Sequence, residues 1–119
     1  PEMAKLGGAA VGDNVRCAQA GAIIARQAAG PAFLATYKER FKREPDVYAP
    51  SFYDQTMFIA QAMKAANSLD PAAVAAQLRT LTHQGVVGTY GYDDKGNLKK
   101  TAVTVYTFKN GALAPLASY

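Results

Sequence analysis

Two phenols, Tyr48 and Tyr53, are the side chains of this sequence best suited to contacting another molecule. They lie five residues apart in the segment EPDVYAPSFYDQ, with Pro50 between them and a long apolar run after them. A tyrosine offers a large, rigid apolar ring and one hydroxyl, which suits either the wall of a binding site or a protein core. The residue types alone leave both interpretations open.

Residues for acid–base, nucleophilic or metal chemistry are few. The sequence has one histidine, His83, and one cysteine, Cys17. A histidine-based charge relay or a thiol enzyme would need further partners, and no C-x-x-C or H-E-x-x-H spacing of metal ligands is present. We therefore expect no catalytic residue, no metal site and no cofactor, and we do not expect an enzyme. His83 is expected to be exposed or structurally satisfied.

Two glycine-containing segments share features with ligand-binding loops, but neither has the full pattern of one. DDKGN at residues 93–97 lacks the acidic spacing and the closing glutamate of a calcium loop, so it predicts a turn. Gly85, Gly88 and Gly91 do not lead from a strand into a helix, which argues against a phosphate-binding loop. Cys17 cannot form an internal disulfide and leaves the redox compartment open.

The length and composition are typical of one globular domain of modest size. The chain has 119 residues, 50% hydrophobic and 18% charged, with a net charge of +4. The basic residues are dispersed and do not alternate with aromatic ones, so we expect no nucleic-acid partner. No apolar run approaches the length that spans a bilayer. Because the sequence opens on Pro1 without an initiator methionine, we expect it to begin inside a longer protein or after processing.

The first predicted helix begins at Pro31, since proline suits the first helical turn. Phe33, Tyr37 and Phe41 recur every four residues and form one apolar stripe, opposite a side that is mostly charged. The helix must end by Glu44, because a proline follows and disfavours helical geometry in the residue before it.

A second helix is predicted from about Ser51 to Asn67, with Ser51 as its cap and Asp54 near its positive end. Apolar residues occupy most of its circumference, which predicts burial on more than one side. The chain offers too few neighbours to cover it, so we expect its partners to be missing. Asp70 and Pro71 are typical of the start of a third helix.

Strands are predicted on either side of these helices. Residues 14–20 form a short candidate strand, and residues 86–92 are rich in strand formers. Residues 101–108 alternate in blocks of valine, threonine and aromatic residues. Asn110-Gly111 is a tight-hairpin signal, so residues 112–116 are expected to form the return strand.

The order of these segments resembles that of a known family. A basic helix precedes EPDVYA, then YD opens an apolar helix, DP opens a third helix, and GVVGTYGYDDKGNLKK leads to VYTFKNG. From about Pro1 to Gly111 the chain resembles the extracytoplasmic solute-binding proteins of branched-chain amino acid ABC transporters, of the Leu/Ile/Val-binding type.

This resemblance implies an α/β fold, the C-terminal fragment of a two-lobed type I periplasmic-binding-protein fold, with three helices, strands and a C-terminal hairpin. About residues 1–25 and 101–119 would belong to one lobe, and about 26–100 to the other. The first-lobe sheet, which lies upstream in the family, would supply the missing neighbours of the second helix.

The resemblance also implies roles for the two tyrosines. Tyr48 matches an aromatic residue beside the ligand's side chain in the cleft between the lobes, so it would be a rigid wall of the ligand site. Tyr53 matches a frequent tyrosine at the helix start, expected to pack under the cleft. The groups that hold an amino acid's carboxylate and ammonium lie upstream in the family, so we expect this chain alone not to bind the ligand.

Residues 13–33 depart from the family pattern, with Arg16, Cys17 and Gln19 where apolar strand residues are typical. The ligand would therefore be a branched-chain amino acid or a different one, an amide, or an aromatic acid. The alternative function is the ligand-sensing domain of a receptor or amide regulator with the same fold.

The implied location is periplasmic or otherwise extracytoplasmic, and the implied partners are a small-molecule ligand and an ABC permease. A chain with uncovered apolar faces is also expected to bury them in a partner. We expect dimerisation or strand exchange, through residues 101–108 and the apolar face of the second helix. A further alternative is that the chain exists only as a proteolytic or engineered fragment without activity of its own.

Overall fold

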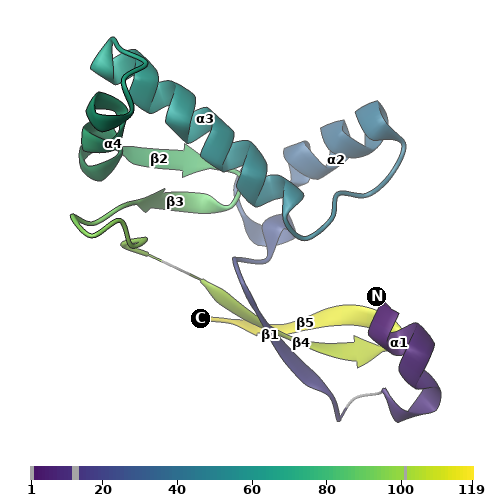
Figure 1. Ribbon diagram of the computed structural model, residues 1–119. Helices are drawn as coiled ribbons and strands as arrows, with labels where there is room; N and C mark the ends of the chain where they lie inside the picture. Colours follow the sequence, from purple (N-terminus) through teal and green to yellow (C-terminus); the bar gives the residue numbers. More distant parts are fainter. Residues whose placement is uncertain (1, 12–13, 101) are drawn as a thin grey trace. The chain divides into compact units, whose positions relative to one another are not determined.

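A computed structural model describes residues 2–11, 14–100 and 102–119 (Figure 1). The chain forms two compact units, each described here by itself. The first contains Pro1–Ile23 and Ala102–Tyr119, and the second contains Ile24–Thr101. Within the described residues, no helix is long and apolar enough to cross a membrane.

The second unit contains three helices and a two-stranded sheet (Figure 1). A short 3₁₀ turn, η2 (Ile24–Arg26), leads into α2 (Gly30–Phe41), which is followed by α3 (Ala49–Ala66) and α4 (Pro71–Thr80). All three predicted helices are therefore confirmed. Helix α2 ends three residues before the expected limit, where Lys42 takes a left-handed conformation as the C-cap.

The start of α3 differs from the prediction. The helix begins at Ala49 rather than Ser51, and Ser51 is not its cap. Instead, Asp46 Oδ1 accepts hydrogen bonds from the backbone N–H groups of Tyr48 and Ala49, both at 2.9 Å. This contact was missed because Asp46 lies two residues before the N-cap residue Tyr48, in a segment where the sequence suggested a loop. The predicted cap of α4 is confirmed, since Asp70 Oδ1 accepts from the N–H of Ala73 at 3.0 Å.

Strands β2 (Thr82–Gly85) and β3 (Gly88–Gly91) form an antiparallel hairpin. Val86 and Val87 form its turn, so their expected strand conformation is wrong. Gly88 directly follows this turn and has a φ of 121°, a backbone conformation that β-branched residues avoid. The chain therefore reverses at the two valines, with the glycine completing the reversal. Tyr92 makes a single bridge to Leu98 across the predicted turn at 93–97.

Helix α3 packs one side against this hairpin and leaves much of its apolar surface uncovered. Its buried residues are Pro50, Asp54, Phe58 and Ala62. The exposed side chains along α3 include Phe52 (70%), Met57 (46%) and Ile59 (41%). The predicted burial on more than one side is therefore not fulfilled within this chain.

The first unit is a three-stranded antiparallel sheet preceded by a short helix (Figure 1). The helix α1 (Glu2–Gly7) and the 3₁₀ turn η1 (Gly8–Ala10) precede β1 (Arg16–Ala20). The sheet order is β1–β4–β5, with β4 (Val103–Lys109) in the centre and β5 (Ala112–Ser118) at one edge. The strand predicted at residues 14–20 is therefore confirmed.

The β4–β5 hairpin turns at Asn110 and Gly111, as predicted. Both residues have positive φ, 52° and 76°. Two positive φ values match the twist of a two-residue hairpin, which explains why asparagine and glycine are favoured there. Thr101 lies outside the described residues, so the predicted strand at 101–108 is observed from Val103 onwards.

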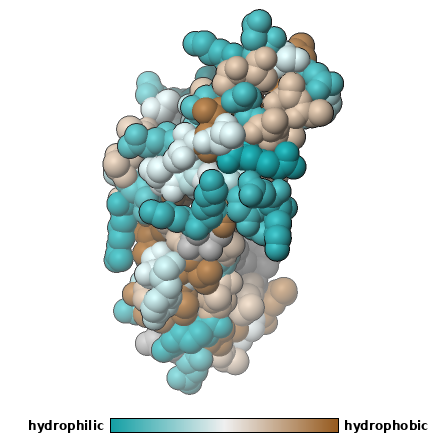
Figure 2. All heavy atoms as spheres, turned by 90° about the vertical axis from the view of Figure 1, so that its left-hand side faces the viewer, coloured by the Kyte–Doolittle hydropathy of each residue, from teal (hydrophilic) through white to brown (hydrophobic). Residues whose placement is uncertain are grey.

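The core of this sheet unit is small and partly polar. Thr104, Thr107 and Phe108 are its buried side chains on β4. Thr104 Oγ1 donates to the carbonyl of Gly21 at 2.7 Å, and Thr107 Oγ1 donates to that of Val15 at 3.1 Å. The lower part of Figure 2, which holds this sheet, shows hydrophobic residues reaching the surface.

Candidate functional site

Tyr48 lies at the amino end of α3 with its side chain largely in solvent. It is the N-cap residue of the helix and its exposed fraction is 68%. The two hydrogen bonds to Asp46 fix the backbone on which its ring is carried. Pro50, which is buried, restrains the first turn of the helix. Tyr48 is therefore an exposed aromatic ring on a well-defined backbone.

Tyr53 lies on the same helix but contacts a different element. Its ring centroid is 5.4 Å from that of Phe33 on α2, with the rings tilted by 52°. It also lines a mainly apolar pocket of about 530 Å³ between α2 and α3. The other lining residues are Ala29, Ala32, Phe33, Thr36, Tyr37, Arg40, Phe41, Ala49 and Val86. Tyr53 remains 49% exposed, so it is packed against α2 on one side only.

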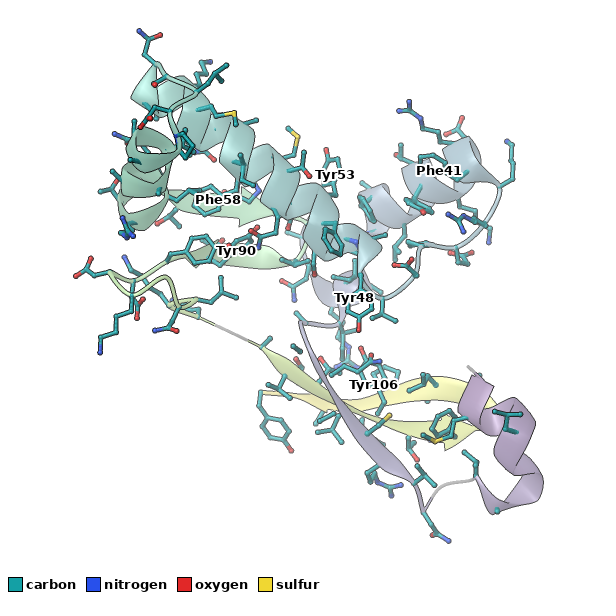
Figure 3. The ribbon with its side chains drawn as sticks, in the orientation of Figure 1. Phe41, Tyr48, Tyr53, Phe58, Tyr90 and Tyr106 are labelled. Atoms are coloured by element: carbon teal, nitrogen blue, oxygen red, sulfur yellow. The ribbon has the colours of Figure 1, made fainter. Side chains whose placement is uncertain are left out.

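The structure does not bring the two predicted site residues together. Positions five apart on an α-helix point about 140° away from each other, because each residue turns by about 100°. The labelled rings accordingly leave the start of α3 in different directions (Figure 3). One ligand contacting both rings face-on is not expected from this geometry.

Asp54 is a functional candidate whose role sequence reasoning missed. The sequence predicted only that it complements the helix dipole, and the structure shows that it is 1% exposed. Its two carboxylate oxygens accept the backbone N–H groups of Val86 and Val87, each at 2.8 Å. Any side chain at Gly85 would overlap this carboxylate. Asp54 therefore fastens the β2–β3 turn onto α3.

Four rings pack together beside this anchor, and we call them the aromatic cluster: Phe58, His83, Tyr90 and Tyr92. Phe58 on α3 and Tyr90 on β3 are labelled in Figure 3. The ring of Phe58 stacks on His83 at 5.2 Å and on Tyr92 at 5.8 Å. Tyr90 meets both Phe58 and His83 edge-on. The hydroxyl of Tyr92 donates to Gln55 Oε1 at 2.6 Å.

Two buried polar atoms of this cluster, His83 Nε2 and Tyr90 Oη, have no hydrogen-bond partner among the described residues. Burial, and then the nearby Asp54 carboxylate, raise the pKa of Tyr90 well above its ordinary value. The phenol therefore stays neutral at physiological pH. His83, expected to be exposed or satisfied, is instead mostly buried with one nitrogen unpaired.

Other titratable groups belong to local surface structure. Asp93 accepts from the side chain and backbone of Asn97, which lowers the pKa of the carboxyl group and closes the predicted turn. Lys38 pairs with Glu44 across the end of α2, which raises the pKa of the lysine. Among the described residues, no group of three or more His, Cys, Asp or Glu side chains is placed to hold a metal ion.

Comparison with known proteins decides the family. The model of the family described as periplasmic binding protein matches residues 1–112. The chain belongs to the periplasmic binding protein family. The predicted resemblance to Leu/Ile/Val-binding proteins is thereby confirmed, and it is supported by individual relatives.

Two relatives of the periplasmic binding protein family illustrate the sequence similarity. The leucine-, isoleucine-, valine-, threonine- and alanine-binding protein of Pseudomonas aeruginosa is 30% identical over 81 residues, 68% of this chain and 22% of that protein. The Leu/Ile/Val-binding protein homolog 1 of Brucella abortus is 36% identical over 70 residues, 58% of this chain and 19% of that protein. The matched segments thus span about a fifth of these relatives.

Solved periplasmic binding proteins share the fold. The leucine binding protein LivK of Thermotoga maritima superposes with a TM-score of 0.83 at 26% identity, covering 99% of this chain and 34% of that one. An ABC transporter substrate-binding protein of Desulfitobacterium hafniense, in complex with Leu, gives 0.76 at 22% identity, covering 85% and 30%. The solute-binding protein of R. palustris, in complex with benzoate, gives 0.70 at 18%, covering 98% and 32%. The chain therefore has the fold of one portion of such a protein, as predicted.

Proposed function

We propose that this chain is part of the extracytoplasmic solute-binding component of an ABC importer, whose ligand is a branched-chain or related amino acid. The observation that carries the proposal is the combination of the family match over residues 1–112 with a relative named for binding leucine, isoleucine, valine, threonine and alanine. In this proposal the protein binds its ligand reversibly and has no catalytic role.

Within this function, we assign Tyr48 to the wall of the ligand site. Its support is the exposed ring on a backbone fixed by Asp46 and Pro50. An exposed aromatic side chain on a defined backbone loses little conformational freedom when a ligand's apolar side chain packs on it. Tyr53 has a weaker claim to ligand contact, because half of its surface is buried and its ring packs on Phe33 of α2.

The ligand is proposed as an amino acid, with an aromatic acid or an amide as the nearest competitors. Arg16 is the reason to keep these competing ligand classes, because β1 has a cationic residue where the Leu/Ile/Val-binding pattern has apolar ones. Its guanidinium donates to Thr107 Oγ1 at 2.9 Å, so the departure is built into the sheet unit. The lobe assignments of residues 1–25 and 101–119 against 26–100 belong to the same proposal.

A ligand screen on the full-length protein tests this function. Thermal unfolding would be recorded with leucine, isoleucine, valine, alanine, benzoate and acetamide. At a ligand concentration a hundred times the dissociation constant, binding adds about 2.7 kcal/mol to the free energy of unfolding. We expect stabilisation by at least one amino acid. Stabilisation by acetamide alone would favour the amide-regulator alternative.

The importer part of the proposal concerns an ABC permease as partner. Disruption of the gene should abolish uptake of the stabilising ligand by cells, and the protein should be recovered from the extracytoplasmic fraction. If the disruption left uptake unchanged although the purified protein binds the ligand, the protein would be a sensor instead.

We also propose that the isolated chain self-associates through the exposed side of α3, which carries Phe52, Met57 and Ile59. The expected use of residues 101–108 as an added strand is less suited to the structure. β4 is the central strand and is hydrogen-bonded on both sides, so among the described strands of this sheet the free edges belong to β1 and β5.

A further inference from the structure

Phe52 adds a second exposed aromatic ring to the start of α3. Its exposed fraction is 70%, close to the 68% of Tyr48. The backbone around it is well defined, because its N–H donates to the carbonyl of Tyr48 at 3.0 Å and its carbonyl accepts the Thr56 hydroxyl at 2.8 Å. An exposed ring on a fixed helical backbone loses little conformational freedom when another molecule packs on it.

Tyr48 and Phe52 lie on the same face of the helix. Residues four positions apart are separated by about 40° around the axis and about 6 Å along it, so their side chains are neighbours. Tyr53 lies about 100° further round than Phe52 and packs on Phe33 of α2 instead. Tyr48 and Phe52 therefore form one aromatic surface, which we call the Tyr48–Phe52 surface.

The other sides of this part of α3 contact elements of the same unit. Asp54 and Phe58, which are buried, face the β2–β3 hairpin, and Tyr53 faces α2. The Tyr48–Phe52 surface is the side that neither the hairpin nor α2 covers, and it begins at the residue that the proposed function places in the ligand site. A ligand that contacts Tyr48 therefore has Phe52 as its next neighbour along the helix.

We propose that Phe52 is a second wall of the ligand site and selects for ligands with a large apolar side chain. This inference rests on the proposed function, in which Tyr48 lines the same site. A branched or aromatic side chain is long enough to pack on both rings at once, whereas the methyl group of alanine reaches one ring only. Because the free energy gained grows with the apolar area removed from water, the second ring favours the larger ligand. The expected ligand class is thus an amino acid with a branched aliphatic or an aromatic side chain.

The test is the ratio of two affinities in the full-length protein, measured by isothermal titration. One is the affinity for the tightest-binding of leucine, isoleucine, valine and phenylalanine, and the other is the affinity for alanine. Phe52→Ala should lower this ratio about five- to thirtyfold, since the ring that it removes contacts the larger ligand and not alanine. Phe52→Tyr keeps the ring and should keep the wild-type ratio. A residue that only stabilises the fold would change both affinities by the same factor and leave their ratio unaltered.

Met57→Ala is the matched control. Met57 is also an exposed apolar residue of α3, at 46%, but it lies about 140° round the helix from Phe52. Its substitution should leave the ratio of affinities unchanged. An equal fall of the ratio in Met57→Ala would overturn the inference, because the loss of selectivity would then not depend on the face of the helix.

The outcomes separate this inference from the proposed function. An unchanged ratio in Phe52→Ala, in a protein that binds one of the four larger amino acids, would overturn the inference alone, and Phe52 would then pack against another part of the protein. A wild-type protein that bound alanine more tightly than any of the four would overturn it too. If the wild-type protein bound no amino acid, the proposed function itself would be wrong, and this inference with it.

Discussion

At the scale of single residues, Tyr48 and Tyr53 lie in different environments. Both are large phenols at the start of α3, yet one ring is mostly in solvent and the other packs on Phe33. Sequence reasoning separated the two tyrosines only through the family resemblance, since residue type and spacing allowed both rings to be core. The deciding physical factor is their angular separation on the helix.

The first prediction concerns these two tyrosines in the full-length protein. Tyr48→Ala should weaken ligand binding by about 1–3 kcal/mol, as expected for an aromatic anchor, with a smaller effect on stability. Tyr53→Ala should chiefly lower stability, because it removes a ring packed against α2. Calorimetric titration and thermal unfolding of both variants measure the two effects. Unchanged affinity with sharply lower stability in Tyr48→Ala would show that this ring belongs to the core.

The second prediction compares two aspartates that each accept two backbone N–H groups. Asp54→Ala leaves the buried donor of Val86 and the part-buried donor of Val87 unsatisfied and should lower the free energy of unfolding by about 2–4 kcal/mol. Asp46→Ala removes an exposed acceptor of two backbone N–H groups at the start of α3 and should cost about 0.5–1 kcal/mol. Urea unfolding measures both. Equal costs would mean that the burial of Asp54 does not determine its contribution.

The third prediction concerns the unpaired hydroxyl of Tyr90. Its pKa is raised in the folded state, so the neutral phenol contributes stability that is present below the ordinary value near pH 10 and lost as the pH rises above it. Tyr90→Phe should unfold less readily in alkali than the wild type. At pH 7 it should be equally stable or gain up to about 1 kcal/mol. The urea unfolding midpoints of both proteins, measured at pH 7 and in alkali, test this. If the two proteins lost the same stability in alkali, the phenol would not be responsible.

At the scale of elements, local signals predicted the three helices and the β4–β5 hairpin. Pro31, Asp70 and Asn110-Gly111 act within a few residues, so their effect can be derived from sequence. The β2–β3 hairpin was only partly predicted, because its turn is determined by Asp54, more than thirty residues away. A contact of that range has no periodic signature in the sequence.

The fourth prediction tests that long-range contact from the other side. Gly85→Ala would place a methyl group against the Asp54 carboxylate, which is held by two hydrogen bonds and cannot move freely. We expect weaker protection of the Val86 and Val87 amides and lower stability. Gly96→Ala is a control for backbone strain alone, because nothing lies near its added methyl group but its φ of 83° is one that alanine adopts only at a cost. If Gly85→Ala were no more harmful than the control, the close packing would be unimportant.

At the scale of the whole molecule, one side of α3 is uncovered. The sequence predicted this, because the helix is apolar over most of its circumference and the chain has too few segments to cover it. The periplasmic binding protein relatives are longer, and the chain covers about a third of the solved ones. The exposed Phe52, Met57 and Ile59 show that residues 24–101 do not cover this helix by themselves.

The fifth prediction follows from that exposed surface. The isolated 119-residue chain should dimerise at micromolar concentration in sedimentation experiments, and Phe52→Ser with Ile59→Ser should reduce the association. The double substitution removes apolar area without touching the buried Phe58. A 12.6 kDa monomer for the unmodified chain would contradict the proposed self-association.

The central claim is that this chain belongs to a protein that binds an amino acid for import. Isothermal titration of the full-length protein with leucine, isoleucine, valine and alanine tests it most directly. The account predicts saturable one-to-one binding of at least one of them, weakened by Tyr48→Ala. Absence of binding to all four in a folded protein, with tight binding of a ligand that carries no amino-acid group, would contradict it.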